Sequence, residues 1–409
     1  MIKNSPPAVK FEGDFSFKGK KEFFMLLLVG AVLRFGYMVV NETIGIDTDI
    51  DYHIYTEASA ELLNPESGNP YNRYTYRYTP LLAYAMIPNL YWMLFGKVLF
   101  NVLDLVAIFY MKLYMNQFSS LSGKQANSIL KFWIFNIYMI YINGRGSCES
   151  VSLVFLAAML YHLRKFRVGG DVSNFHLLCG AFFYGMLVHF RLYPIVFGLS
   201  VVFYITRGSL IPNANLIKFF IVSGGLFIGL FVLFRALYGD LFSYEYAFYH
   251  LGRKDPRHSQ SVFWMRTMYL YKDGDTLPVN IITLICRLSL IVLASLKYRK
   301  NFILAIFTQS LIFTVFNTVY TAQYAIWEIQ LLPFIFVQSS MWTNGKKTLG
   351  ALLGFLFILM EASILSGGLY EAKGQNTLKV MHILNVVYVV ARLVYLNRVL
   401  KSSLPVADY

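Results

Sequence analysis

Three carboxylates stand close together early in the chain, at Asp47, Asp49 and Asp51, directly after an apolar stretch. Two carboxylates at this spacing could share a divalent cation, or one of them could accept the proton of a sugar hydroxyl during a group transfer. A solvated acidic loop is the plainer interpretation of so short a string. The string therefore poses a choice between a metal site, a general base and an acidic loop.

Further polar side chains lie where apolar stretches end. Arg77 could hold a lipid phosphate through two parallel hydrogen bonds, although an arginine at a membrane boundary can also serve only as an anchor. Gly144 and Gly146 would let the backbone come close to a ligand, and short helix connections also favour glycine. The other candidate substrate-binding residues are Tyr78, Arg145, Glu149, His189, Arg191, His250, Arg253, Asp255, Arg257, His258 and Gln323.

Four arginines and Glu328 lie inside apolar stretches. Arg34, Arg235, Arg287 and Arg392 are expected to extend their charge towards the membrane surface and receive no role. Glu328 is a functional candidate, because an ionisable group inside the membrane is costly unless it is used.

The composition requires a lipid environment for most of the chain. Of the 409 residues 57% are hydrophobic, the mean hydropathy is +0.52 and only 14% are charged, whereas about a quarter are charged in soluble proteins. The net charge of +14 is spread between apolar stretches instead of forming a basic stripe with interleaved aromatic residues, so we expect no nucleic-acid partner.

Apolar runs predict an all-α polytopic membrane protein of about 12 transmembrane helices. Residues 1–409 form a single domain in this interpretation, with two long connections at about 41–96 and 239–277. The stretch Leu81–Phe95 is expected to lie along the membrane surface. The predicted spans are 23–40, 97–115, 128–142, 148–163, 175–189, 192–206, 216–238, 278–296, 301–317, 325–341, 347–366 and 379–396.

The distribution of Lys and Arg predicts the orientation. Short segments on the side of the N-terminus carry most of them, which favours a cytosolic position for both termini. Both long connections then share the opposite, non-cytosolic compartment. The candidate residues in these connections would therefore face the same side of the membrane.

Seven strings, taken together and in order, resemble the family of the first mannosyltransferase of glycosylphosphatidylinositol (GPI) anchor synthesis. The resemblance extends over nearly the whole chain. The strings are TDIDY (48–52), NPYNRYTYRYTPLL (69–82), FGKVLF (95–100), GRGSCES (144–150), VHFRLYP (188–194), YHLGRKDPRH (249–258) and FNTVYTAQY (316–324).

The resemblance implies an enzyme of the endoplasmic reticulum membrane with the GT-C fold, two lumenal loops containing interfacial helices, and a lumenal active site. The donor would be dolichol phosphate mannose and the acceptor glucosaminyl phosphatidylinositol, acylated on inositol. The product would be an α1,4-linked mannose formed with inversion. A small single-pass accessory subunit is the implied partner; no cofactor is implied with certainty, and a divalent cation stays open.

In related membrane glycosyltransferases the catalytic aspartate precedes an aromatic residue, as Asp51 precedes Tyr52 here. This likeness makes Asp51 the candidate base. Asp49 is the alternative, and otherwise would hold a metal with Asp51, position the acceptor amine, or raise one pKa of the pair by repulsion.

Two other functions stay open. One is a related transferase that acts on a dolichol-linked oligosaccharide. The other is a lipid or sugar transporter, for which Glu328 and Glu361 are the best support. A transporter of this kind is expected to place charged groups near the midplane of broken helices, whereas most candidates here lie in turns.

Overall fold

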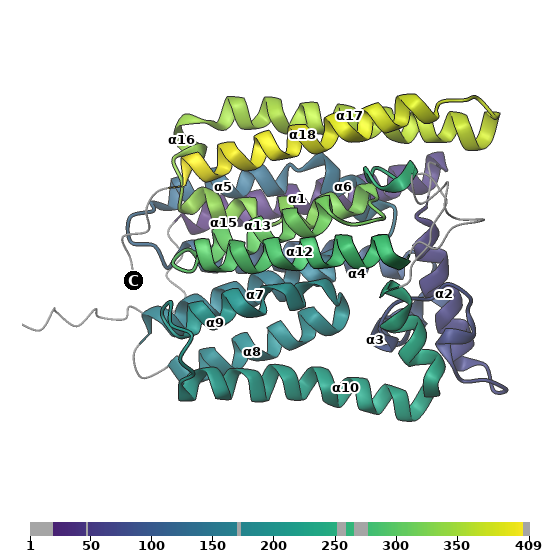
Figure 1. The fold of residues 1–409 in the computed structure, drawn as a ribbon, viewed down its shortest axis with the longest axis horizontal. Coiled ribbons are helices and arrows are strands. Elements are labelled where there is room, and N and C mark those ends of the chain that lie inside the picture. Colours follow the sequence, from purple (N-terminus) through teal and green to yellow (C-terminus); the bar gives the residue numbers. More distant parts are fainter. Residues whose placement is uncertain (1–18, 46–47, 170–172, 252–258, 266–276, 404–409) are drawn as a thin grey trace, which may run out of the picture.

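The structure is a computed structural model that describes residues 19–45, 48–169, 173–251, 259–265 and 277–403. Helices form the regular structure of these residues, apart from one isolated bridge between Ser339 and Ser403. The prediction of an all-helical membrane protein is confirmed (Figure 1).

Within the described residues, five helices are long and apolar enough to cross a membrane. They are α1 (Lys20–Ile44), α4 (Phe95–Met115), α10 (Ala214–Tyr246), α17 (Lys346–Lys373) and α18 (Leu378–Ser402). The other helices of the bundle are α5 (Gly123–Ile134), α6 (Ile137–Gly144), α7 (Glu149–Val168), α8 (Ser173–Phe190), α9 (Gly198–Ile205), α12 (Leu277–Lys297), α13 (Phe302–Val315), α14 (Ile326–Ile329), α15 (Leu332–Val337) and α16 (Met341–Asn344). Two further helices lie between α1 and α4, namely α2 (Ile50–Leu63) and α3 (Pro80–Ala85).

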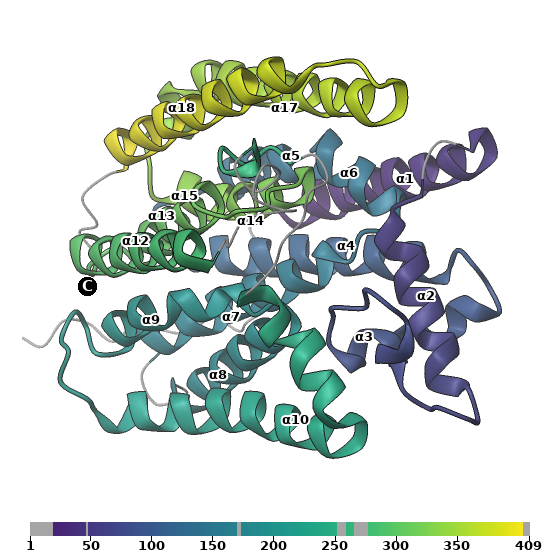
Figure 2. The ribbon, with the colours of Figure 1, turned by 45° about the vertical axis from the view of Figure 1, so that its right-hand side comes forward.

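The long helices run along one common direction, horizontal in Figure 1. The hairpin of α17 and α18 covers one edge of the bundle and α10 covers the opposite edge, an arrangement that Figure 2 also shows. The helices α2 and α3 close the right-hand end. The start of α1 and the end of α18 both lie towards the left-hand end, so the chain leaves the bundle on the side opposite α2 (Figure 1).

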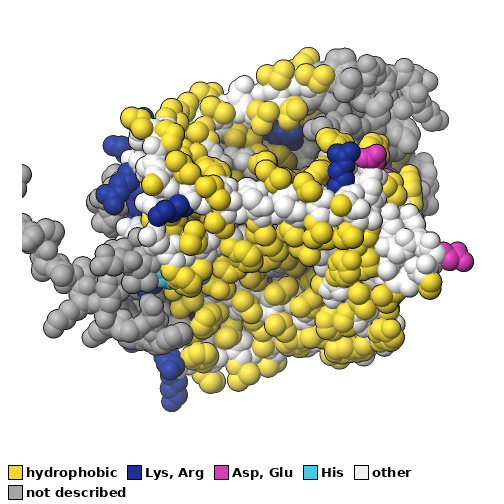
Figure 3. All heavy atoms as spheres, turned by 90° about the horizontal axis from the view of Figure 1, so that it is seen from below, with side chains coloured by type: hydrophobic (Ala, Val, Ile, Leu, Met, Phe, Trp, Pro, Cys, Tyr) yellow, Lys and Arg dark blue, Asp and Glu magenta, His cyan; other side chains and the backbone are white. Residues whose placement is uncertain are grey.

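The outer faces of the long helices are apolar. Figure 3, which looks towards the α10 edge, shows a broad hydrophobic surface over the middle of the molecule, with Lys and Arg gathered mainly at the left-hand end. Exposed apolar residues of the long helices include Leu28 and Val32 of α1, Ile221 and Ile228 of α10, and Leu365 of α17. Such a surface is stable when lipid covers it, since large exposed apolar areas are rare in soluble monomers.

Two predicted spans are interrupted in the structure. The span 128–142 divides into α5 and α6, because the side chain of Asn136 accepts hydrogen bonds from the backbone N–H groups of Tyr138 and Met139 and starts a new helix. The span 325–341 divides into α14, α15 and α16, with Pro333 in the first turn of α15. Hydropathy alone does not detect such breaks, because the residues on both sides of them stay apolar.

The first long connection contains more structure than predicted. The stretch Leu81–Phe95 is not one interfacial helix, because α3 ends at Ala85 and Pro88 lies in a separate 3₁₀ turn, Ile87–Leu90. The helix α2 was not predicted. In the second connection α10 continues to Tyr246, past the predicted end at residue 238, with a break at Gly239, whose φ is +68°.

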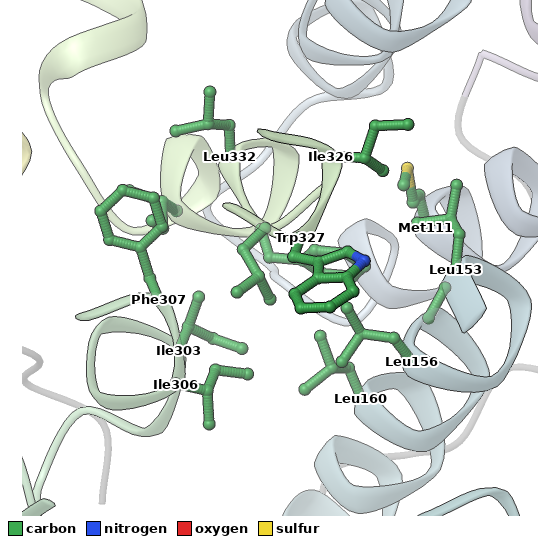
Figure 4. Packing of buried hydrophobic residues seen from close by; sticks show 14 of the residues in the cluster. Met111, Leu153, Leu156, Leu160, Ile303, Ile306, Phe307, Ile326, Trp327 and Leu332 are labelled. Carbon is green, nitrogen blue, oxygen red and sulfur yellow. The ribbon is translucent and has the colours of Figure 1, made fainter. Parts of the chain in front are cut away.

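Trp327 joins the two halves of the bundle. Its ring lies among Leu153, Leu156 and Met111 on one side and α13 on the other (Figure 4). It also stacks on Tyr193 with ring centroids 3.9 Å apart. The buried indole N–H donates to Glu149 Oε2 at 2.9 Å, so the same residue packs the core and holds a carboxylate at the start of α7.

Two of the arginines expected to reach the membrane surface are instead buried in ion pairs. Arg34 is 0% exposed and its Nε donates to Asp104 Oδ2 at 2.6 Å, which joins α1 to α4. Arg392 of α18 pairs with Glu328 of α14, both at most 5% exposed. The expectation was wrong for these two residues because a carboxylate on a neighbouring helix makes burial of the charge tolerable.

We expect Arg34→Ala to lower the free energy of unfolding by about 3–5 kcal/mol, because Asp104 would keep its charge without a partner. Thermal unfolding in detergent measures this loss. Arg235→Ala is the matched control, since Arg235 pairs with Asp240 at the exposed surface, where such pairs contribute little. Equal melting temperatures of the two variants would contradict the prediction.

Candidate active site

Asp49 begins α2 as its N-cap residue. Its backbone is extended, with φ −60° and ψ 133°, and its side chain accepts a hydrogen bond from the backbone N–H of Asp51 at 3.1 Å. Aspartate is a preferred residue for this position because a helix starts with unpaired N–H groups. This hydrogen bond fixes the position of Asp51 in the first turn of α2. Asp47 lies outside the described residues.

The turn between α6 and α7 holds the acidic segment. The N–H of Asp49 donates to the carbonyl of Arg145 at 2.9 Å. Gly146 has φ +94°, and a Cβ on it would lie 2.3 Å from the ring of Tyr52. A Cβ on Gly144 would lie 2.4 Å from the ring of Tyr37. The close approach predicted for these glycines is therefore an approach to aromatic rings. Because the backbone packs so closely here, the carbonyl of Arg145 can accept the hydrogen bond from Asp49.

Tyr52 and Lys97, which were not predicted as residues of the site, complete this support. The hydroxyl of Tyr52 lies 2.6 Å from Asn89 Oδ1 and 2.6 Å from the carbonyl of Met93, two acceptors for its one proton. Lys97 is buried, pairs with Glu42 and donates to Thr48 Oγ1 at 3.0 Å. The signal that the sequence offered for these residues was Gly96. In the structure a Cβ at this position would overlap Tyr52 and Met86.

Asp51 is the more accessible of the two carboxylates. It is half-buried, and its Oδ2 accepts a hydrogen bond from the hydroxyl of Tyr78 at 2.7 Å. Burial and the charge of Asp51 raise the pKa of Tyr78 well above its ordinary value, so Tyr78 stays a donor. One oxygen of Asp51 is thus held in place, while Oδ1 makes no hydrogen bond to any residue that the structure describes.

Asp49 is 7% exposed and both of its carboxylate oxygens are engaged. Oδ1 accepts from the N–H of Asp51, and Oδ2 accepts from Nε2 of Gln323. Burial, together with the charge of Asp51, raises the pKa of Asp49 to about 6, and the N–H of Asp51 and the charge of Arg145 partly offset this shift. Asp49 is better placed to position Asp51 than to react.

Glu149 and Arg191 lie beside Tyr78. The guanidinium of Arg191 pairs with Glu149 and lies 4.9 Å from the centre of the Tyr78 ring. Arg145 is a cation close to Asp49, and its guanidinium lies 5.2 Å from the centre of the Tyr141 ring. The predicted residues Asp49, Asp51, Tyr78, Arg145, Glu149, Arg191 and Gln323 are thus joined by contacts at one end of the bundle.

Two other predicted binding residues connect elements of the protein to one another. Arg77 pairs with Glu245 of α10, and its guanidinium lies 3.9 Å from the centre of the Tyr249 ring. His189 is 0% exposed, with Nε2 2.8 Å from Thr79 Oγ1. Both residues fasten the first connection to the bundle, which leaves them fewer donors for a substrate.

The remaining candidates belong to the second long connection. His250 is exposed in the turn after α10. Arg253, Asp255, Arg257 and His258 lie outside the described residues, and their proposed contacts with a head group stay predictions.

The residues around the acidic pair fit a metal ion poorly. Magnesium and calcium prefer six or more oxygen ligands, whereas Asp49 and Asp51 accept hydrogen bonds from Gln323, Tyr78 and a backbone N–H. No group of three or more His, Cys, Asp and Glu side chains within the described ranges is placed to hold a metal. We derive no step of the reaction through a metal.

Asp51 is a half-buried carboxylate oriented by a tyrosine, and one of its oxygens bonds to none of the described residues; with arginines close to Asp49 and Tyr78, it can act as a general base beside an anionic leaving group. Its place at one end of an apolar helical bundle defines an integral-membrane group-transfer enzyme.

The comparisons with known proteins agree with this class. The family model described as Mannosyltransferase (PIG-M) matches residues 142–400. The protein named GPI mannosyltransferase 1 of Kluyveromyces lactis is 33% identical over 380 residues, 87% of this chain and 89% of its own. Its namesake in Dictyostelium discoideum is 31% identical over 368 residues, 80% of each chain. In Danio rerio, the GPI alpha-1,4-mannosyltransferase I catalytic subunit is 31% identical over 345 residues, 81% of this chain and 83% of its own.

The chain therefore belongs to the PIG-M family of mannosyltransferases, which confirms the resemblance drawn from its strings.

We expect Gly146→Ala to lower mannosyl transfer about 100-fold, because the added Cβ would displace Tyr52 and with it the carboxylates. Initial rates in detergent measure the effect. Gly68→Ala is the control, since Gly68 also has a positive φ, +55°, but a Cβ there would meet nothing within 4 Å. Equal losses in both variants would assign the effect to backbone strain alone.

We expect mannosyl transfer to fall as the pH drops through about 6, the raised pKa of Asp49. Asp49 is ionised above this value, and its protonation below it weakens the hydrogen bonds that hold the acidic segment. Asp49→Asn removes this titration, so its acidic limb should move to lower pH. Initial rates between about pH 5 and about pH 8 test this. A limb that stays near 6 in Asp49→Asn would belong to another group.

Proposed function

We propose that the protein transfers the first mannose of a GPI anchor from dolichol phosphate mannose to glucosaminyl phosphatidylinositol or its inositol-acylated form. The product would carry an α1,4-linked mannose, formed with inversion. The observation that carries the proposal is the oriented carboxylate of Asp51 in a chain whose relatives bear the name of this activity.

In this proposal Asp51 accepts the proton of the acceptor hydroxyl as that oxygen forms a bond to C1 of the mannose. The bond between C1 and the phosphate oxygen breaks, and dolichyl phosphate leaves with the electron pair. Attack opposite the leaving group inverts the configuration at C1. General-base assistance of this kind contributes about 10²–10⁴ in rate, and positioning and electrostatic stabilisation supply the remainder.

The arginines divide into two roles. Arg145 lies beside the carboxylates and would stabilise the charge that develops on the departing phosphate. Arg191 is largely neutralised by Glu149 and stacks on Tyr78, so it would position the tyrosine that orients Asp51. Asp49 and Gln323 would act in the same way from the opposite side of the acidic segment.

The proposal includes the membrane arrangement. About 12 passes with the GT-C fold would combine the five long helices with the shorter and interrupted apolar ones. The end with Asp49 and Asp51 would face the lumen of the endoplasmic reticulum, and both termini, which leave from the opposite end, would be cytosolic. The relative from Danio rerio is named a catalytic subunit, which supports a small single-pass accessory subunit as partner.

A dolichol-linked oligosaccharide is the alternative acceptor, and the assay below separates it. For a transporter, Glu328 and Glu361 were the best support, and the charge of Glu328 is compensated by Arg392. No observation favours that function over transfer.

The purified protein in detergent should transfer radiolabel from dolichol phosphate mannose to glucosaminyl phosphatidylinositol and leave an oligosaccharide-lipid unlabelled. Asp51→Asn should lower this transfer about 10²–10⁴-fold, the contribution of a general base. Asp240→Asn is the matched control, because Asp240 is an exposed carboxylate that pairs with Arg235. Labelling of the oligosaccharide-lipid instead would contradict the acceptor, and nearly full activity of Asp51→Asn would contradict the base.

Removal of divalent cations should leave mannosyl transfer within about twofold of its initial value, because hydrogen-bond donors surround the two carboxylates. The measurement is the rate before and after dialysis against a chelator. If transfer is lost and added magnesium or manganese restores it, the prediction is wrong, and the metal would need ligands outside the described residues.

A further inference from the structure

A cavity of about 50 Å³ lies at the end of the bundle away from Asp49 and Asp51. Its walls come from the C-terminal turns of α4, α7 and α9, from the connection of α12 and α13, and from the residue after α15. Arg164 of this cavity follows Glu149 by fifteen positions on α7, or roughly 20 Å along the helix. The cavity is therefore separate from the candidate active site.

The cavity is basic. Arg164, Arg167 and Lys300 line it, and none of the lining residues that the structure describes is an Asp or a Glu. Like charges gathered around one space repel one another unless an anion enters it. The general excess of basic residues at a cytosolic face explains charges that extend into water, but not two half-buried arginines directed at a common cavity.

Protein contacts fix the arginines in place. The guanidinium of Arg164 lies 3.5 Å from the centre of the Phe118 ring, and its buried Nε has no hydrogen-bond partner among the described residues. Arg167 donates from Nη1 to the carbonyl of Tyr204 at 2.6 Å. The planar guanidinium of Arg164, fixed by its stack on Phe118, can donate to two oxygens of one anion.

The remaining walls suit an amphiphilic ligand. Leu160, Phe302 and Ile303 present apolar surface next to the cations. The volume is several times the roughly 10–15 Å³ that one water molecule needs, which is enough for a group with four oxygens such as phosphate. Phosphates of anionic lipids are the anions concentrated at a membrane surface.

We propose that this cavity binds the phosphate group of an anionic ligand, with Arg164 and Lys300 as its principal cations. The ligand is a lipid head group of the leaflet at that end or free inorganic phosphate, since both offer the same chemistry. The site is additional to mannosyl transfer and does not depend on the proposed acceptor.

Binding of dioctanoyl phosphatidic acid, dioctanoyl phosphatidylcholine and inorganic phosphate to the purified full chain tests this, by titration calorimetry at constant ionic strength. We expect phosphatidic acid to bind, and Arg164→Gln/Lys300→Gln to raise its dissociation constant about tenfold or more, as the loss of charge-assisted hydrogen bonds implies. Lys346→Gln/Lys347→Gln removes the same charge from exposed residues outside the cavity and should change the constant less than about twofold.

The different probes distinguish a lipid head group from free phosphate. Binding of phosphatidic acid alone identifies a lipid head group, and binding of inorganic phosphate that the same double variant weakens identifies free phosphate. Lys300→Gln alone, at an exposed side chain, should fold normally and weaken binding in the same direction. Retained mannosyl transfer shows that the variants are folded. Equal losses in both double variants, no loss in either, or no binding of any probe would overturn the proposal.

Discussion

The site depends on the hydrogen bond from the backbone N–H of Asp49 to the carbonyl of Arg145. This bond fixes the acidic segment against the turn between α6 and α7, and it forms only because Gly146 has no Cβ to strike Tyr52. With the backbone fixed, Asp49 caps α2 and Asp51 points to Tyr78. The two carboxylates therefore acquire different roles from their environments, although they stand two positions apart.

Buried charges connect this end of the protein to the membrane bundle. Glu149 accepts from Trp327, whose ring is packed between the two halves of the core, and it holds Arg191 against Tyr78. The orientation of Asp51 is thus linked to the packing of α14 through three side chains. Arg34 with Asp104 and Arg392 with Glu328 fasten the first and last helices in the same manner. Breaking a buried ion pair between two helices costs more free energy of folding than the intact pair contributes, because one charge is left buried without a partner. These pairs therefore favour one arrangement of the helices.

Hydropathy and charge predicted the helical membrane class, and the ordered strings predicted the family. Several residues of the candidate site were also predicted, because Asp49, Asp51, Tyr78 and Gln323 are polar groups in turns. Tyr52, Lys97 and Gly96 were not predicted as site residues, since aromatic, basic and glycine residues near a membrane have many ordinary explanations. The ion pairs of Arg34 with Asp104 and of Arg392 with Glu328 depend on which helices become neighbours, and a single sequence does not state this. The breaks at Asn136 and Pro88 depend on local backbone hydrogen bonding, which hydropathy averaged over a span does not register.

The central claim is that Asp51, held by Tyr78, faces the reacting hydroxyl. An experimental structure of the protein with dolichyl phosphate and the acceptor lipid tests it most directly through one distance, from Asp51 Oδ1 to the oxygen that receives mannose. We expect a separation of about 2.6–3.2 Å, with the phosphate on the opposite side of the sugar position near Arg145. An acceptor oxygen bound to another carboxylate, with Asp51 turned away from the acceptor, would contradict it.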